Sequence, residues 1–260
     1  MNMPISEIDK KGYIILIGIG AFIIMMVIIA YNIVKPPYSC DDNNLNAHTM
    51  IIIDTTDPLT EGQQKRVRAL VKVIKDEIKT HEKFSIFILE AELNGLSDPL
   101  FSACQPPKGS EANPFYQNRR IYEKRYRDSY EKLFNQILPR ITLGGQGTQS
   151  PIMEALIEAG QRSDFSQKIA KRRLVLISDM LQNTNILTFL NNNTLVQDNR
   201  RQTNTRGDNI PLPNLLRVQV EMHIIQRPNI RGFQGDSLTK FWVRYFQDAG
   251  AQVSKIEKRF

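Results

Sequence analysis

The stretch Met50-Ile51-Ile52-Ile53-Asp54 decides the fold, because four apolar residues follow one another and a carboxylate ends the run. A short apolar run rich in β-branched residues is typical of a strand that is buried on both faces of a parallel sheet. Two later stretches have the same character: Phe84 to Leu89, and Leu174 to Ile177, which Ser178-Asp179 follows. We therefore predict three central strands, and two of them end at an aspartate.

Helical patterns alternate with these strands. The apolar residues between Glu61 and Thr80 recur at helical spacing, and a basic segment from Gln117 to Leu138 carries one apolar stripe. A third segment, from Ser237 to Ala249, is strongly amphipathic and stops at Gly250. The remaining predicted strands are Val218–Ile225 and Val253–Ile256. Strands that alternate with helices predict an α/β fold, a doubly wound, mainly parallel sheet flanked by helices.

The connections carry signals of their own. Residues 94–114 are rich in Pro, Ser and Gly and predict a loop. Ser150-Pro151 opens a further helix, with Ser150 as the N-cap and Pro151 at the first helical position. The polar stretch from Leu181 to Pro213 predicts a long loop, which inside a compact domain is usually functional or disordered.

An apolar segment near the N-terminus predicts a membrane anchor. No charged residue lies between Lys11 and Lys35, and about 20 such residues match the thickness of a bilayer. A buried core helix would have a polar face, which this run lacks. A cleaved signal peptide would have a small-x-small site, which Ala30-Tyr31-Asn32 does not provide. The predicted organisation is a tail over residues 1–12, a transmembrane helix over 13–34, a linker over 35–48 and one domain over 49–260.

The flanking charges predict the orientation of this anchor. Lys10 and Lys11 precede the segment and Lys35 follows it, which favours a cytoplasmic N-terminus. The C-terminal domain is then non-cytoplasmic, and periplasmic if the cell is bacterial. The chain has two cysteines, Cys40 and Cys104, which an oxidising compartment would allow to pair. Two unrelated free thiols are the alternative.

The charge balance raises nucleic-acid binding as a possibility, since the chain has 34 Lys and Arg against 27 Asp and Glu. The basic residues, however, are interleaved with acidic ones, as in the segment from Arg119 to Asp128, and no recognition motif accompanies them. A solvated helix face explains this segment better. We therefore expect a protein partner and not a nucleic acid.

Three segments together resemble the von Willebrand factor A family and its metal-ion-dependent adhesion site. They are Asp54-Thr55-Thr56-Asp57-Pro58 after a strand, Thr148-Gln149-Ser150-Pro151 before a helix, and Ser178-Asp179 at the end of a strand. The family pattern is D-x-S-x-S, then a threonine in a T-P-x-x-x-A-L stretch, then an aspartate that closes a strand. The resemblance implies Mg²⁺ or Mn²⁺ bound by Asp54, Thr56, Ser150 and Asp179, some of them through water. An open coordination position would take a carboxylate from the partner.

The chain departs from this pattern at one ligand. Pro58 stands where the second serine belongs, and proline has no side-chain oxygen. Thr148 is a rival to Ser150 for the threonine position, and Asp57 adds an acid that could replace the lost ligand or cap the next helix. The loss of one ligand weakens metal binding without excluding it. The sequence therefore predicts a membrane-anchored binding module. Two versions of this fold remain open, one that binds a metal ion and one that is a metal-free scaffold.

An enzyme of the haloacid dehalogenase type is the remaining alternative. Asp54 after a strand and Ser178 at the end of another suit that reading. Its first motif, however, needs a second carboxylate two residues after the nucleophile, to act as general acid. Thr56 stands at that position, and the next acid is Asp57. We therefore expect a subunit of a membrane-associated assembly and no catalytic residue.

Overall fold

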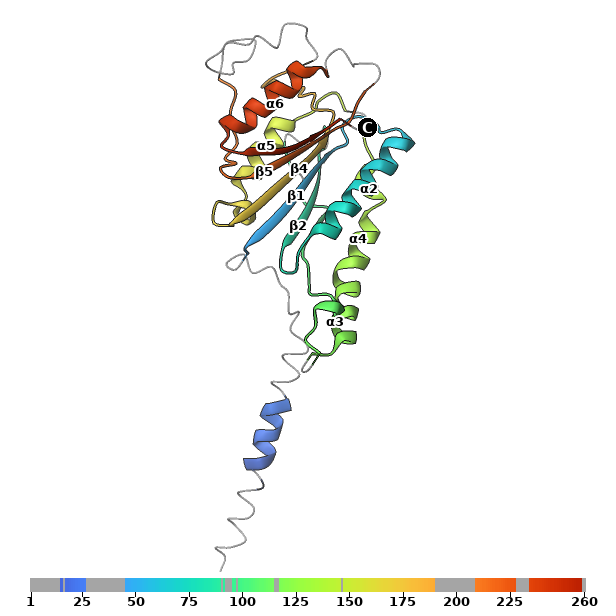
Figure 1. Ribbon diagram of the computed structural model, residues 1–260, viewed down its shortest axis with the longest axis vertical. Helices are drawn as coiled ribbons and strands as arrows, with labels where there is room; N and C mark the ends of the chain where they lie inside the picture. The colour runs from blue at the N-terminus through green and yellow to red at the C-terminus, as the bar shows by residue number, and fades with distance from the viewer. Residues whose placement is uncertain are drawn as a thin grey trace, which may run out of the picture. The chain divides into compact units, whose positions relative to one another are not determined.

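The computed structural model describes residue 15 and residues 17–26, 45–89, 91, 95–96, 98–114, 117–145, 147–189, 209–227 and 234–258. The chain divides into two units, Met1–Ser39 and Cys40–Phe260. In the first unit, residues 17–26 are helical. The second unit contains the sheet and the helices that flank it, which Figure 1 shows.

A mainly parallel sheet forms the centre of the second unit (Figure 1). Its order is β3-β2-β1-β4-β5-β6, and among the described strands only the β2–β3 pair is antiparallel. The strands are β1 (Ala47–Asp54), β2 (Lys83–Leu89), β3 (Phe101–Cys104), β4 (Lys171–Ser178), β5 (Gln219–Ile224) and β6 (Gln252–Glu257). The predicted α/β class, with a mainly parallel sheet flanked by helices, is confirmed.

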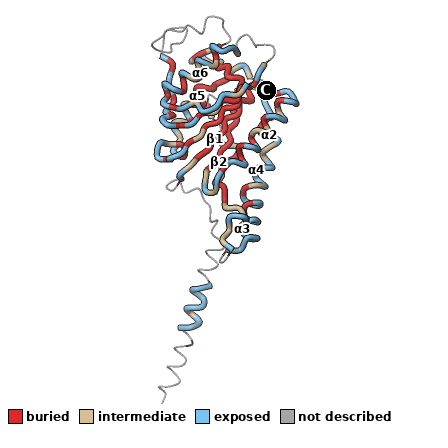
Figure 2. The backbone as a smooth tube through the Cα atoms, in the orientation of Figure 1, coloured by how far each residue is buried: buried red, intermediate tan, exposed pale blue. Residues whose placement is uncertain are grey.

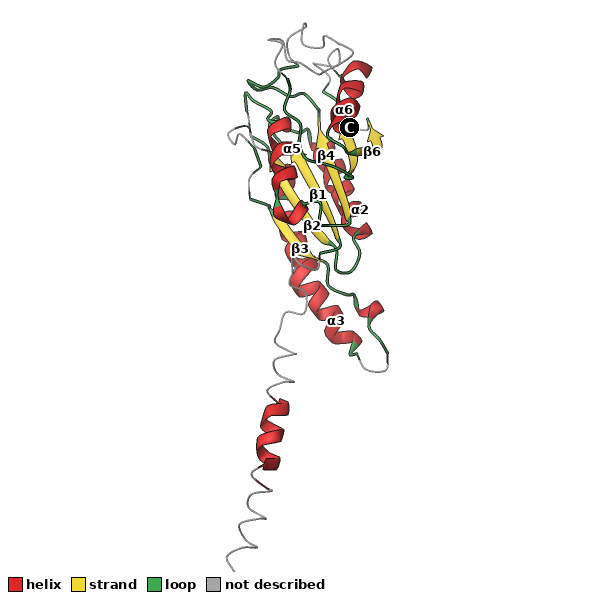
Figure 3. Ribbon diagram, turned by 90° about the vertical axis from the view of Figure 1, so that its left-hand side faces the viewer, coloured by secondary structure: helices red, strands yellow, loops and turns green. Residues whose placement is uncertain are grey.

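The helices lie on both faces of this sheet, as the two perpendicular views show (Figures 1 and 3). They are α2 (Glu61–Glu77), α3 (Arg119–Tyr126), α4 (Lys132–Ile137), α5 (Ile152–Gln161) and α6 (Asp236–Asp248). Short helical turns are η1 (Gly109–Glu111), η2 (Arg127–Glu131), η3 (Arg140–Thr142) and η4 (Ser163–Phe165). Side chains alternate along a strand, so Ile51 and Ile53 pack in the cluster with α2, while Met50 and Ile52 pack with α5 and α6. Both faces of the central strands are therefore buried (Figure 2).

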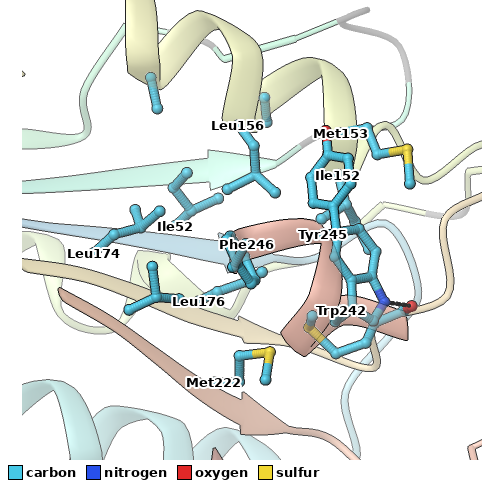
Figure 4. Packing of buried hydrophobic residues seen from close by; sticks show 14 of the residues in the cluster. Ile52, Ile152, Met153, Leu156, Leu174, Leu176, Met222, Trp242, Tyr245 and Phe246 are labelled. Carbon is cyan, nitrogen blue, oxygen red and sulfur yellow. Dashed lines mark hydrogen bonds between the residues drawn. The ribbon is translucent and has the colours of Figure 1, made fainter. Parts of the chain in front are cut away.

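The aromatic residues of α6 fill the core on one face of the sheet (Figure 4). Trp242, Tyr245 and Phe246 are fully buried among aliphatic residues of α5 and the strands. The indole Nε1 of Trp242 donates a hydrogen bond of 2.8 Å to the carbonyl of Met180, which follows β4. Gly250, with a φ of 77°, ends this helical segment in a left-handed conformation that favours glycine. The predicted helix and its stop are thus confirmed.

One prediction about the middle of the chain is wrong. Residues 94–114 were expected to form only a loop, but β3 lies within them and pairs with the outer edge of β2. Phe101 is its one fully buried apolar residue, so the segment lacks a strand pattern of its own and the free edge of β2 decides its structure. The helix predicted from Gln117 to Leu138 is present, since the chain is helical from Arg119 to Ile137, with the π-helical segment η2 between α3 and α4.

Half of the predicted anchor falls outside the described residues. Of residues 13–34, the structure describes residue 15 and residues 17–26. Among the described residues, no helix has both the length and the apolar character needed to cross a membrane.

Cys104, at the end of β3, is disulfide-bonded. The chain has one other cysteine, Cys40, which lies outside the described residues. The alternative of two free thiols is therefore wrong for Cys104.

Candidate functional site

Four residues that the sequence singles out lie at the carboxyl edge of the sheet. Asp54 ends β1, Thr56 follows it, Ser150 precedes α5, and Asp179 comes directly after β4. All four are buried, with exposed fractions between 3% and 8%. The strand order reverses between the neighbours β1 and β4, and such switch points are where open α/β sheets bind ligands. The fold thus brings residues from three distant segments to one place.

The Asp54 carboxylate is the centre of a hydrogen-bond network. Its Oδ1 accepts from the backbone N–H of Thr56 at 3.1 Å and from the Thr56 hydroxyl at 2.7 Å. Its Oδ2 accepts from the hydroxyls of Ser150 at 3.2 Å and Ser178 at 2.7 Å. A carboxylate has about four lone-pair positions, so this buried charge is fully satisfied by the protein.

Ser178 is the member of this network that the sequence analysis did not propose as a site residue. Ile53 pairs with Ile177 across β1 and β4, so Asp54 and Ser178 are the next residues on two adjacent strands. Besides donating to Asp54, the Ser178 hydroxyl accepts a 2.8 Å hydrogen bond from the backbone N–H of Met180. The sequence feature that could have indicated Ser178 was its position beside Asp179 at the end of an apolar strand.

The sequence predicted Ser150 as the N-cap of a helix, and this prediction is wrong. The Ser150 hydroxyl donates to Asp54. Helix α5 begins at Ile152, and Pro151 precedes it without a side-chain cap. The side chain of Gln182 takes over the capping role, since its Oε1 accepts from the backbone N–H of Met153 at 2.8 Å. Thr148, the rival to Ser150, is exposed. The site hydroxyl is therefore that of Ser150.

The glycine-rich turn before Ser150 lies close against the loop after β1. A Cβ added to Gly144 would stand 2.6 Å from the carbonyl oxygen of Thr55, a distance that side-chain carbons do not tolerate. The backbone N–H of Gly147 donates to the carbonyl of Thr56 at 3.0 Å. The glycines thus allow the segment that carries Ser150 to reach Asp54.

Asp179 has an unusual electrostatic environment. Burial, followed by the nearby charge of Asp54, raises its pKa to about 7, and Asp57 adds to the shift. The backbone N–H of Leu181, which donates to Oδ1 at 3.0 Å, and the charge of Arg227 oppose this rise in pKa. Among the described residues, the carboxyl edge thus brings Asp54, Asp57 and Asp179 close to the guanidinium of Arg227.

Arg227, in the segment after β5, is the cation at this site. Its Nε donates to Oδ2 of Asp179 at 3.2 Å, its Nη1 to the carbonyl of Pro58 at 2.8 Å, and its Nη2 to the carbonyl of Asp57 at 3.3 Å. The guanidinium therefore joins the end of β4 to the loop after β1. No local sequence pattern indicated this role.

Two glutamines hold the segment that carries Arg227. Gln234 accepts from the backbone N–H of Arg227 at 2.7 Å and donates to the carbonyls of Ile225 at 2.8 Å and Asp179 at 3.1 Å. From the other side, Gln63 of α2 donates to the carbonyl of Gln226 at 3.1 Å. Arg227 is therefore fixed by contacts on both sides of its backbone.

These contacts bear on whether the residues suit the divalent cation that the resemblance implies. The described residues contain no group of three or more His, Cys, Asp and Glu side chains that could hold a metal ion, although the implied site needs only two carboxylates. The hydroxyls of Thr56 and Ser150 keep lone pairs, but Asp54 is saturated, Asp179 binds Arg227, and Pro58 offers no side chain. Mg²⁺ prefers at least one available carboxylate, so the donor set as arranged does not fit it.

The histidines lie apart from this site. His48 is buried between the carbonyl of Asp164 and the hydroxyl of Ser85, at the start of the sheet. His223 lies in β5 between Glu221 and Glu257, at 3.6 Å and 3.3 Å. His48 and His223 thus lie on different strands, β1 and β5.

No protein-family model matches the chain, and no curated protein matches it.

Proposed function

We propose that this chain is a membrane-anchored protein-binding module with a von Willebrand A-like domain, and a subunit of a membrane-associated assembly. The observation that carries the proposal is the buried network around Asp54, which joins Thr56, Ser150 and Ser178 at the switch point of the sheet. Ligands bind open α/β sheets at this position, and the loops that surround it reach solvent at Asp57 and Thr148.

The resemblance to the von Willebrand A family gains support from this arrangement. Its three sequence segments are far apart along the chain, and one hydroxyl from each, those of Thr56, Ser150 and Ser178, donates a hydrogen bond to Asp54. The order of the strands is that of a doubly wound sheet, with the first strand at its centre.

A binding role is supported over hydrolysis by the state of Asp54. A nucleophilic carboxylate needs a free oxygen, whereas both oxygens of Asp54 accept two hydrogen bonds from the protein. The position of the general acid holds Thr56, whose aliphatic hydroxyl is too weak an acid to protonate a leaving group and instead donates a hydrogen bond to Asp54. The network thus suits a rigid frame for surrounding loops better than a reaction centre.

The proposed anchor rests on the segment that precedes the domain. Residues 17–26 are apolar throughout, and their described large side chains are more than half exposed along the helix. A helix that is apolar on all sides suits a membrane, because it presents no polar face to water. The disulfide at Cys104 supports placement of the domain in an oxidising compartment outside the cytoplasm.

Site-specific photo-crosslinking in native membranes tests this proposal. A photoreactive residue at Asp57 or Thr148, both exposed at the carboxyl edge, should give a discrete adduct with a partner protein. The matched control is Lys171, which is exposed at the opposite edge, where β4 begins. If all three positions give the same adducts or none, the carboxyl edge is not the binding surface.

A further inference from the structure

We propose that Arg227 supplies the positive charge that a divalent cation would supply in this site, so that the site is metal-independent. This inference rests on the proposed function, because it concerns how the same site is held together. The resemblance implies a metal bound between the loop after β1 and the end of β4. The guanidinium of Arg227 joins these two segments.

Arg227 contacts the position at which this chain departs from the family pattern. Pro58 replaces the second serine, and its carbonyl accepts the shortest hydrogen bond of the guanidinium, at 2.8 Å. The position that lost a hydroxyl ligand thus provides a backbone acceptor for an arginine. Arginine suits this role, since its planar fork can donate to a carboxylate and to neighbouring carbonyls at once.

Burial distinguishes this ion pair from an ordinary surface contact. The Asp179 side chain is 5% exposed and the Arg227 side chain 14% exposed, and their atoms are 3.2 Å apart. By contrast, the exposed pair between Arg127 and Asp128 spans 3.9 Å, with both side chains more than half exposed. A buried carboxylate without a countercharge either destabilises the fold or takes up a proton, so a nearby cation stabilises the charged form of Asp179. Arg227 supplies this cation from within the chain.

Hydrogen bonds to the backbone around Arg227 also hold its guanidinium in position. Gln234 fixes the backbone of Arg227, and Gln63 fixes that of Gln226. The backbone N–H of Ile225 donates to the carbonyl of Ser178 at 2.9 Å, so the segment continues directly from the β4–β5 pair. A divalent ion beside Asp179 would have to displace this fixed charge or tolerate its repulsion.

Direct measurement of Mn²⁺ binding tests the inference on the purified full-length chain in detergent. The free Mn²⁺ signal in electron paramagnetic resonance should be undiminished by the native protein, and Mg²⁺ should not raise its melting temperature. Arg227→Gln keeps a polar side chain but removes the charge, and it should gain one Mn²⁺ site with an affinity increased on the order of a hundredfold. Adding Asp179→Asn to this variant should abolish the gain.

The controls separate charge at the site from charge elsewhere. Arg127→Gln makes the same change on an exposed residue of η2, away from the site, and should gain no Mn²⁺ binding. Arg227→Lys keeps a positive charge and should also bind none. If Arg227→Gln does not fold, the native protein still decides the question by its own Mn²⁺ signal.

Two results would overturn the inference. One is stoichiometric Mn²⁺ binding by the native chain that Asp54→Asn abolishes, which would make the site a metal site. The other is a folded Arg227→Gln variant that still binds no Mn²⁺, which would show that Arg227 does not stand in for the ion. Neither result depends on a partner, whereas the proposed function fails only in the crosslinking experiment.

Discussion

The network around Asp54 predicts a large stability loss for a small change, Ser178→Ala. Ser178 is fully buried, and its hydroxyl makes two hydrogen bonds, to Oδ2 of Asp54 at 2.7 Å and from the N–H of Met180 at 2.8 Å. Loss of a hydrogen bond to a charged group costs about 1.5–3 kcal/mol, and an unsatisfied buried N–H costs about 1–3 kcal/mol. Because these costs overlap when the site relaxes, we expect the free energy of unfolding to fall by about 2–4 kcal/mol.

Urea unfolding followed by tryptophan fluorescence measures this change. Trp242 is the only tryptophan of the chain, and its indole donates to the carbonyl of Met180, next to the altered site. The matched control is Ser129→Ala, which removes an exposed hydroxyl bonded to a helical carbonyl and should change stability by less than about 0.5 kcal/mol.

A double-mutant cycle with Asp54→Asn separates the proposed contact from a general packing loss. If Ser178 acts through Asp54, the two substitutions should be non-additive, with a coupling energy of about 1 kcal/mol or more. A loss below about 1 kcal/mol for Ser178→Ala, or additive effects in the cycle, would refute the reasoning.

Three further predictions concern the pH response, the anchor and the topology. Burial lowers the pKa of His48 to about 4, below its ordinary 6.5, so the unfolded chain takes up a proton first and stability should fall by up to about 3 kcal/mol between pH 6.5 and pH 4. In urea midpoints measured across this range, His48→Gln should flatten the slope, and an unchanged slope would contradict the assignment to His48. Removal of the residues before Lys35 should release a soluble, folded domain, since the described core begins at Leu45. Circular dichroism and urea unfolding check this, and a molten product would mean that the N-terminal apolar segment belongs to the fold. A reporter fused after Phe260 should behave as non-cytoplasmic, and the chain should migrate faster without reductant; a cytoplasmic reporter signal would reverse the predicted orientation.

Local patterns were sufficient to predict the class of the fold. Three of the strands are apolar runs long enough to be buried on both faces, as the split of Ile51 and Ile52 between two core clusters shows. In such strands the residue type alone indicates the burial, because every side chain meets a helix layer. Helices with a clear apolar stripe, such as α6, could be predicted for the same reason.

The edge strands and caps depended on neighbours distant along the chain. β3 forms because β2 has a free edge, and its own four residues carry little strand signal. Ser150 has the sequence signature of an N-cap, but helix α5 begins at Ile152, and the Ser150 hydroxyl donates to the charged Asp54. The tertiary fold supplies this acceptor, which lies far away along the chain.

From residue types alone, Asp54, Thr56, Ser150 and Asp179 could be assigned to one site, because carboxylates and hydroxyls at strand ends meet at one edge of a parallel sheet. Their contacts, the added hydroxyl of Ser178 and the charge of Arg227 follow from the folded chain. Ser178 enters the network through the register of β1 and β4, and Arg227 through the hydrogen bonds of Gln63 and Gln234. The reason is that hydrogen bonds and ion pairs act over a few ångströms, and residues 54, 179 and 227 come within that distance only when the sheet has formed.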